Sequence, residues 1–281
     1  MTKFKNQPWN LFKRKFVSFT KKKVNPTPRV VTGIKNLNTY SLLKSCHGVN
    51  YYLWNGSEFN PNQPTFIVTH GWRAKGAKSG VFQKLLAAIK ARATHANVIL
   101  VDWTEYSTSL NYTTVKNNTL KVGDWVRNFL IDLKINPATT TLIGHSLGAH
   151  ILGNAGDGYR KEIGRSINTI IALEPAGPLY STTCKGQRLD DGDAAHVVAL
   201  HSTDFIGYKG AIGDVDIYLN DWSYDSQSGL NGLLSAGLRH LYPVLVLTDL
   251  FEGKRFKQGD NSSFSLTCLY TRSGSSVVKT I

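Results

Sequence analysis

The chain has 281 residues, of which 41% are hydrophobic, and its formal net charge is +14. This length and composition are typical of a globular chain with room for one large α/β domain or two small domains. No run of 18 or more apolar residues occurs, which argues against a membrane-spanning helix. The sequence also lacks the short internal period that is typical of a repeat protein.

The positive charge is concentrated at the N-terminus. Residues 1–30 hold nine basic residues and no acidic one, so the rest of the chain carries only +5 (14 − 9). Within this basic arm, Trp9, Phe12, Phe16 and Phe19 are spaced so that their rings share one face of a helix. We expect the basic arm to bind an anionic membrane or another acidic surface. The alternatives are packing against the chain's own core and binding to nucleic acid.

The basic arm also bears on location. A secretory signal peptide contains a block of about 7–15 apolar residues, and Lys and Arg interrupt the arm throughout. We therefore expect an intracellular chain or one packaged in a particle such as a virion, with secretion by a route without a signal peptide as the alternative. The three cysteines, Cys46, Cys184 and Cys268, allow at most one internal disulfide, so a disulfide-stapled fold is not indicated.

From residue 64 onward, short apolar strands alternate with helical patterns. Apolar residues at helical spacing predict a helix over 118–135 and a second helix that follows Ser146 and stops in GDG at 156–158. Strands are expected at 64–70, 96–103, 139–145, 167–175 and 195–202. The alternation predicts a single α/β domain over residues 31–281, with a mostly parallel sheet covered by helices on both faces.

Several polar residues fall where the expected strands end. They are His70, Asp102, Ser146, Glu174 and Asp204. The carboxyl ends of parallel strands share one edge of the sheet, and sites in such sheets form along that edge. We therefore expect these side chains to lie near one another.

Ser146 lies in the sequence GHSLG at 144–148, between an expected strand and an expected helix. In this context G-x-S-x-G is typical of a nucleophilic serine on a sharp turn, and glycines flank the serine because the turn leaves no room for side chains. The first N–H groups of the following helix would face an oxyanion formed at the serine. A Gly-rich turn of a nucleotide-binding fold is the alternative.

A serine of this kind is followed along the chain by an acid and then by a histidine. Glu174 ends the next strand, where a carboxylate can orient an imidazole; a rim charge or salt-bridge partner is the alternative. His240 is the last of the eight histidines and satisfies the order. The second oxyanion donor in this class comes from a loop after an early strand. We therefore expect the backbone N–H groups of Trp72, in that loop, and of Leu147, next to the serine, to form the oxyanion hole.

Several longer stretches of the sequence resemble the motifs of a known protein family. They are FIVTHGW, VDW, IGHSLGAHILG, LEPAGPLY and RLDDGDAAHVVALHSTDFIGYKGAIGDVDIYLN, followed by His240. Together they resemble the animal pancreatic-lipase family, with insect lipases and phospholipases A1 as the most similar-looking members. The resemblance implies an α/β-hydrolase fold, and we expect that the chain departs from the pancreatic enzymes by having no room for their C-terminal β-sandwich domain. The resemblance also implies a serine esterase that cleaves carboxyl esters of triglycerides or phospholipids through Ser146, Glu174, His240 and an acyl-enzyme. A lipase-like protein that binds lipid or has a structural role, with weak or no turnover, is the alternative.

The chain departs from this family at two places that affect the expected site. The family usually has Asp where Glu174 stands, so Asp204, at the end of the following strand, is the alternative acid. The 19 residues between Asn220 and His240 contain no cysteine. We therefore expect a short lid loop without a disulfide, which by resemblance favours phospholipase A1-type action.

A further segment, RLDDGDA at 188–194, resembles the family's calcium loop. Asp190 and Asp193 would supply side-chain oxygens, joined by backbone carbonyls near Lys185 and Arg188, and hard oxygen ligands suit Ca²⁺. A solvated acidic turn is the alternative. No cofactor is expected to be required, and Ca²⁺ would have a structural role.

Overall fold

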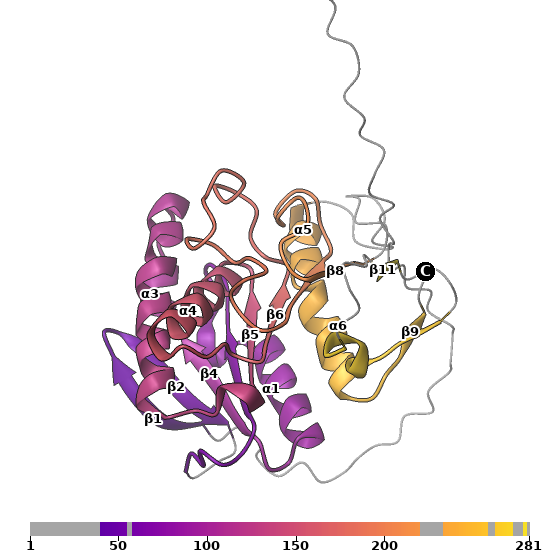
Figure 1. The fold of residues 1–281 in the computed structure, drawn as a ribbon. Coiled ribbons are helices and arrows are strands. Elements are labelled where there is room, and N and C mark those ends of the chain that lie inside the picture. Colours follow the sequence, from indigo (N-terminus) through magenta and orange to yellow (C-terminus); the bar gives the residue numbers. More distant parts are fainter. Residues whose placement is uncertain (1–39, 55–57, 220–232, 258–261, 272–277, 280–281) are drawn as a thin grey trace, which may run out of the picture.

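A computed structural model describes residues 40–54, 58–219, 233–257, 262–271 and 278–279. Their centre is a nine-stranded sheet with the order β1-β2-β4-β3-β5-β6-β7-β8-β11 (Figure 1). Its strands are β1 (Tyr40–Cys46), β2 (Val49–Trp54), β3 (Thr65–Thr69), β4 (Asn97–Asp102), β5 (Thr140–His145), β6 (Thr169–Leu173), β7 (Val197–His201), β8 (Val215–Tyr218) and β11 (Val278–Lys279). Two short strands, β9 (Phe256–Lys257) and β10 (Ser263–Phe264), pair with each other.

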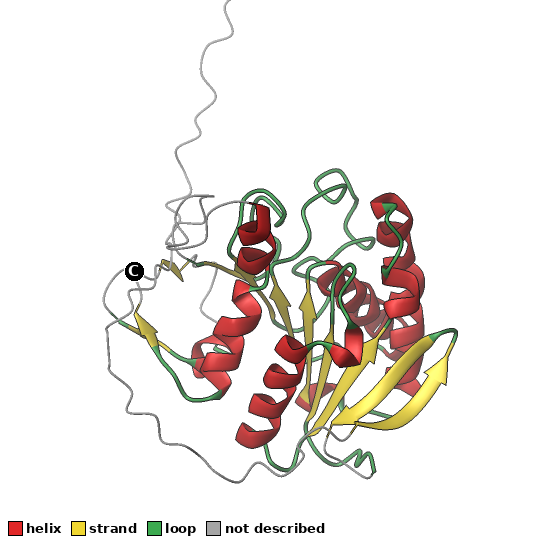
Figure 2. Cartoon of the chain, turned by 180° about the vertical axis from the view of Figure 1, so that it is seen from behind, coloured by secondary structure: helices red, strands yellow, loops and turns green. Residues whose placement is uncertain are grey.

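Helices cover both faces of the sheet (Figures 1 and 2). The α-helices are α1 (Gly80–Arg92), α2 (Thr104–Ser107), α3 (Tyr112–Asp132), α4 (Leu147–Ile163), α5 (Leu233–His240) and α6 (Tyr242–Phe251), and the 3₁₀ turns are η1 (Gly76–Lys78), η2 (Pro137–Thr139) and η4 (Leu266–Leu269). Helices α3 and α4 bury their apolar sides in one core, and α1 and α6 bury theirs in a second core on the opposite face. None of the described helices is long and apolar enough to cross a bilayer.

The central strands β3 to β8 pair in parallel, whereas β1 pairs with β2 and β2 with β4 in antiparallel fashion. This is the topology of the α/β-hydrolase fold, so the expected fold class is confirmed. All five expected strands are present, and β4, β5, β6 and β7 are buried along nearly their whole length, as parallel strands covered on both faces should be. The antiparallel pair β1–β2 and the strand β8 were not expected from the sequence.

Two helix boundaries differ from the expectation. Helix α3 begins at Tyr112, six residues before 118, because the side chain of Asn111 accepts the N–H of Thr114 and caps an earlier turn. Helix α4 does not stop in GDG but continues to Ile163. Gly156 packs directly against the backbone oxygen of Asp193, where a Cβ would not fit, so here glycine permits close packing rather than ending the helix. The helix ends at Gly164, which has the left-handed φ of 73°.

Two expected segments cannot be compared with the structure, and the expectation for the cysteines can. The basic arm at 1–30 and most of the expected lid loop, 220–232, lie outside the described residues. Cys46, Cys184 and Cys268 all fall within the described part and none of them forms a disulfide there.

Candidate active site

Ser146 lies on a sharp turn between β5 and α4. Its φ of 57° and ψ of −123° are conformations that a non-glycine residue adopts only when its surroundings impose them. Here the N–H of Ser146 donates to the carbonyl of Leu173 on the neighbouring strand, over 3.0 Å. A Cβ on Gly144 would lie 2.6 Å from Cα of Ala149, and one on Gly148 would lie 2.6 Å from the carbonyl oxygen of His70. The two flanking glycines therefore allow the turn that the G-x-S-x-G motif predicted.

The loop after β3 packs against this turn. A Cβ on Gly71 would lie 2.7 Å from Cβ of Ser146, so the backbone of residues 71–72 passes directly beside the serine. Leu147 is the first residue of α4, and its N–H has no partner within the helix. Neither the N–H of Trp72 nor that of Leu147 has a hydrogen-bond acceptor among the described residues. Two free donors beside a serine are what an oxyanion hole needs.

His70 fixes the peptide plane that carries the Trp72 donor. The side chain is fully buried, and its Nδ1 donates to the carbonyl of Gly71 over 3.0 Å. That carbonyl and the N–H of Trp72 belong to the same planar peptide unit. On the other side of the ring, Nε2 accepts the N–H of Trp103 and lies 3.4 Å from Oδ1 of Asp102. His70 therefore braces this loop.

His240 ends α5 and lines the same cavity as Ser146. Its backbone carbonyl accepts Nε2–H of His145 over 2.9 Å, and the two imidazole rings lie 4.7 Å apart. Burial lowers the pKa of His240 well below the usual value and lowers the pKa of His145 to about 4. Both imidazoles are therefore neutral near pH 7. No hydrogen bond joins His240 to Ser146 among the described residues, although both line the cavity. A neutral imidazole that comes within reach of a serine hydroxyl can accept its proton.

Glu174 follows β6 directly and is fully buried, with a positive φ of 47°. Its carboxylate accepts the backbone N–H groups of Ser202 and Thr203 and the hydroxyl of Ser202. Gly207 passes so close to Oε1 of Glu174 that a Cβ there would not fit. Burial raises the pKa of Glu174 to about 7, against the lowering effect of His201 and of the hydrogen bonds from Ser202 and Thr203.

Glu174 does not line the cavity, but one residue connects it to the helix that ends in His240. The hydroxyl of Ser202, which contacts Glu174, also lies 2.7 Å from the backbone oxygen of Arg239, the neighbour of His240. Within the part of the chain that the structure describes, Nδ1 of His240 has no hydrogen-bond partner. Asp204, the alternative acid, is half-buried and forms no hydrogen bond or ion pair among the described residues. The assignment of Glu174 or Asp204 as the acid stays a prediction.

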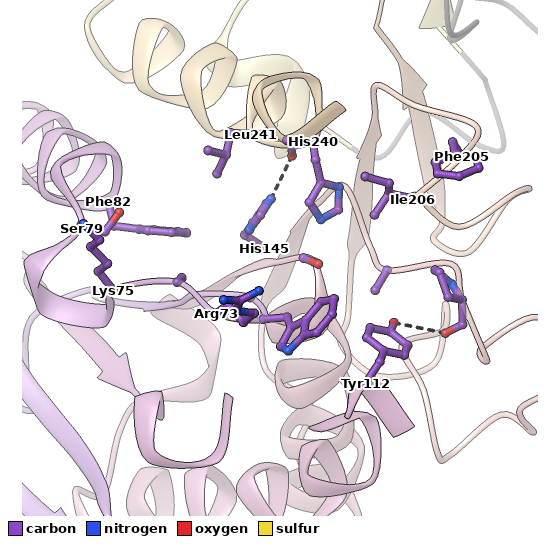
Figure 3. Close-up of a pocket in the computed structure, with 17 residues that line it drawn as sticks. Arg73, Lys75, Ser79, Phe82, Tyr112, His145, Phe205, Ile206, His240 and Leu241 are labelled. Carbon is purple, nitrogen blue, oxygen red and sulfur yellow. Dashed lines mark hydrogen bonds between the residues drawn. The ribbon is translucent and has the colours of Figure 1, made fainter. Parts of the chain in front are cut away.

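The cavity over Ser146 has a volume of about 660 Å³. Figure 3 shows His145, His240 and Leu241 at its upper side, with Tyr112, Ile206 and Phe205 on one flank. Lys75, Ser79 and Phe82 lie on the other flank, with Arg73 between the two. Most of the lining is apolar, and a few polar groups converge on Ser146, which is typical of a site for a largely apolar small molecule.

With the fold and the serine turn in place, comparison with known proteins identifies the family. A family model described as Lipase matches residues 4–229. The chain belongs to the lipase family. The resemblance to pancreatic lipases that the motifs indicated is therefore confirmed.

Within the lipase family, the chain is 37% identical to phospholipase A1 member A of Rattus norvegicus over 189 residues, which cover 66% of the chain and 40% of that relative. It is 37% identical to lipase member H of Danio rerio over 171 residues, 59% of the chain and 37% of that relative. The matches thus span about two fifths of these curated relatives. Among solved structures, it is similar to an α/β hydrolase enzyme from a Medee basin deep-sea metagenome library, with a TM-score of 0.43, 12% identity and coverage of 77% of this chain and 98% of that one.

The expected calcium loop of this lipase-family chain brings two carboxylates together. Asp190 and Asp193 are both buried, and Oδ2 of Asp193 accepts the N–H of Asp190 over 2.8 Å. Oδ1 of Asp190 accepts the N–H of Gly192, and its Oδ2 accepts that of Gly186. Burial and the neighbouring Asp190 raise the pKa of Asp193 to about 8. No group of three or more His, Cys, Asp or Glu side chains among the described residues is arranged to hold a metal ion.

Several residues of the site could not be assigned from the sequence motifs. Ser202 and Gly207 hold Glu174, yet they lie in a loop whose pairing with the end of β6 is purely tertiary. Arg73 and Lys75 line the cavity, although in the sequence they look like ordinary surface residues that follow the HGW motif. Asp102 was expected at the sheet edge, and the structure shows its carboxylate accepting the backbone N–H groups of Ala77 and Thr104.

Proposed function

We propose that this lipase-family chain is a serine esterase that hydrolyses carboxyl esters of glycerolipids, with phospholipase A1-type action on phospholipids. The observation that carries the proposal is the environment of Ser146. This residue occupies the strained turn between β5 and α4, opens into a largely apolar cavity of about 660 Å³, and shares that cavity with His240. A reactive hydroxyl, a neutral imidazole and room for an acyl chain are the requirements of ester hydrolysis in this fold.

In the proposed mechanism, Oγ of Ser146 attacks the ester carbonyl while His240 accepts the hydroxyl proton. The N–H groups of Trp72 and Leu147 donate to the resulting oxyanion; removal of one such donor typically costs about 10²–10³ in kcat. His240 then gives the proton to the departing alcohol oxygen, which leaves an acyl-Ser146 ester. Water, deprotonated by His240, hydrolyses this ester to release the fatty acid and restore the serine. Glu174 stabilises the imidazolium that forms in both steps.

The decisive experiment compares the full chain with Ser146→Ala. We expect wild type to release fatty acid from phosphatidylcholine and from triglyceride, and Ser146→Ala to lower kcat by about 10⁴-fold or more, since a triad acts as a unit. A fluorophosphonate should label wild type at Ser146 and leave the variant unlabelled. Retention of activity in Ser146→Ala would remove the serine assignment.

The position of cleavage tests the finer statement. With phosphatidylcholine labelled at either acyl chain, phospholipase A1-type action releases the sn-1 fatty acid first. Release of fatty acid from triglyceride alone would contradict the phospholipase part of the proposal and leave the esterase part standing.

A second candidate function, lipid binding without turnover, is favoured by one observation. The oxygens of Glu174 accept hydrogen bonds from Ser202 and Thr203, and Nδ1 of His240 has no hydrogen-bond partner among the described residues. An imidazole without an orienting acid is a poor general base. Vesicle binding by a wild-type chain that neither turns over ester nor reacts with a fluorophosphonate would select this candidate.

A further inference from the structure

The cavity over Ser146 carries positive charge on one side. Arg73 and Lys75 line it together with apolar and aromatic residues, and none of the described lining residues is acidic. Neither cationic side chain forms a hydrogen bond or ion pair with another described residue. Charges of one sign above a low-dielectric wall concentrate the field on whatever enters the cavity.

The loop that carries the two cations is held in place. Arg73 has a left-handed φ of 54°, a conformation that a non-glycine residue keeps only where its surroundings impose it. Its N–H donates to the carbonyl of Ser107 over 2.9 Å. The indole of the preceding Trp72 donates to the carbonyl of Ser109 over 2.8 Å. The backbone origin of the guanidinium is therefore fixed relative to the oxyanion donor next to it.

The two flanks of the cavity differ in chemistry. Tyr112, Phe205 and Ile206 form a flank without charge, whereas the opposite flank holds Lys75 beside Phe82, and Arg73 lies between the two flanks (Figure 3). An ester bound with its carbonyl at Ser146 can direct its acyl chain to only one flank. The uncharged flank suits the acyl chain, which leaves the cationic side for the alcohol part of the ester.

On the basis of the proposed esterase function, we propose that Arg73 and Lys75 form a subsite for a phosphate carried on the alcohol part of the substrate, so that this enzyme prefers glycerolipids with an anionic phosphate headgroup. A guanidinium binds phosphate oxygens through two parallel hydrogen bonds, and an ammonium adds a point charge. In a glycerophospholipid the phosphate is joined to the same glycerol as the ester, a few bonds from the reacting carbonyl. A neutral diacylglycerol with the same acyl chains lacks only this group.

The kinetic test uses dioctanoyl phosphatidic acid and dioctanoyl glycerol, each diluted in micelles of a neutral detergent so that the lipid adds little surface charge. We expect wild type to show the higher kcat/KM on the phosphatidic acid. Each of Arg73→Gln and Lys75→Gln should lower the ratio of the two kcat/KM values by about tenfold, the size of one charge-assisted contact. The double variant should lower it by about 100-fold. Lys84, exposed on α1 and outside the cavity, supplies the matched control: Lys84→Gln removes one charge and should leave the ratio unchanged.

A binding measurement keeps the inference separate from turnover. The full chain with Ser146→Ala is titrated with dihexanoyl phosphatidic acid, with dihexanoyl glycerol and with inorganic phosphate. We expect the phosphatidic acid to bind most tightly and its affinity to fall about tenfold for each cation replaced. Inorganic phosphate binding as tightly as the lipid would overturn the lipid-headgroup assignment.

The outcomes distinguish the two proposals. If wild type hydrolyses both lipids and the double variant keeps the wild-type ratio, the subsite is wrong and the esterase function stands. If wild type hydrolyses neither lipid, the esterase function fails, and the titration alone decides whether Arg73 and Lys75 bind phosphate.

Discussion

At Glu174, a single hydroxyl links the carboxylate to the backbone next to His240. Ser202 has one hydroxyl hydrogen, yet its Oγ contacts both Oε2 of Glu174 and the backbone oxygen of Arg239. When Glu174 is ionised, the hydroxyl donates to the carboxylate. When Glu174 is protonated, its own O–H can donate to Ser202, which then donates to Arg239. The protonation of the buried acid thus changes the hydrogen bonding of the residue next to His240.

This environment predicts the pH dependence of activity. Glu174 must be ionised to stabilise the imidazolium, and its pKa is raised to about 7 by burial, whereas burial keeps His240 neutral to lower pH. We expect kcat/KM to rise with pH with a midpoint near 7. Glu174→Gln should lower kcat by about 10³–10⁴-fold, as loss of the acid does in related triads, and should remove that midpoint.

The alternative acid supplies the control for this experiment. Asp204→Asn removes a half-buried carboxylate that forms no described hydrogen bond, so we expect it to leave both kcat and the midpoint unchanged. The reverse result, with activity kept in Glu174→Gln and lost in Asp204→Asn, would show that Asp204 is the acid of the triad.

At the scale of elements, helix α4 and the acidic loop that follows β6 are packed as one unit. Gly153 and Gly156 of α4 leave room for Oδ2 and the backbone oxygen of Asp193. His150, also on α4, accepts the N–H of Leu189 and stacks on Tyr180, with the rings 3.6 Å apart. The loop is therefore packed against the helix that follows Ser146, and the carboxylates of Asp190 and Asp193 are buried rather than part of a solvated turn.

We propose that Asp190 and Asp193 bind Ca²⁺ in this loop. Without a cation, folding buries Asp193 with a pKa raised to about 8 from its usual 3.8, so it favours the protonated state. Its contribution to the free energy of unfolding is then greatest at low pH and is lost as pH rises from about 4 to about 8. Ca²⁺ at about 100 times its Kd would add about 2.7 kcal/mol, which corresponds to a Tm increase of about 5–10 °C.

The measurement is thermal unfolding at pH 8 with Ca²⁺, with Mg²⁺ and with a chelator. Asp193→Asn should unfold at a higher temperature than wild type in chelator and should gain nothing from Ca²⁺. Asp191→Asn, whose carboxylate pairs with Lys185 at the surface, is the control and should keep the Ca²⁺ response. An unchanged wild-type Tm in the presence of Ca²⁺ would contradict the proposal.

At the scale of the whole molecule, the charge is divided between the basic arm and a nearly balanced remainder. Residues 1–30 supply nine of the 14 net positive charges. We propose that the arm attaches the enzyme to an anionic lipid surface, where each basic residue contributes about 1 kcal/mol at low salt. Two exposed aromatic residues, Trp72 and Phe205, also line the cavity over Ser146.

Vesicle co-sedimentation of the full chain and of a chain without residues 1–30 tests this proposal. We expect the full chain to bind anionic vesicles at low salt, to release them at high salt, and to bind neutral vesicles weakly. The matched control replaces Trp9, Phe12, Phe16 and Phe19 by Ser and keeps the charge; it separates the aromatic contribution from the electrostatic one. Equal binding by both chains refutes the proposal, and loss of folding on truncation indicates that the arm packs against the core.

Features that depend on local chemistry and chain order could be predicted before the structure was known. Alternating apolar strands and helical patterns predict the parallel sheet, because each element must bury its apolar side. The glycines at 144 and 148 predict the sharp turn at Ser146, since no other residue fits there. The family follows from several such motifs in one order, and the model described as Lipase matches the same chain.

Which distant residues meet depends on long-range packing that the sequence patterns do not show. Ser202 and Gly207 enclose Glu174, and Arg73 and Lys75 enter the cavity, through contacts between loops that no periodicity encodes. The raised pKa of Glu174 and the lowered pKa of His240 are likewise tertiary, since both arise mainly from burial. Desolvation depends on how completely the surrounding elements exclude water. A local pattern can therefore name the residues of the site, whereas packing sets their protonation and their partners.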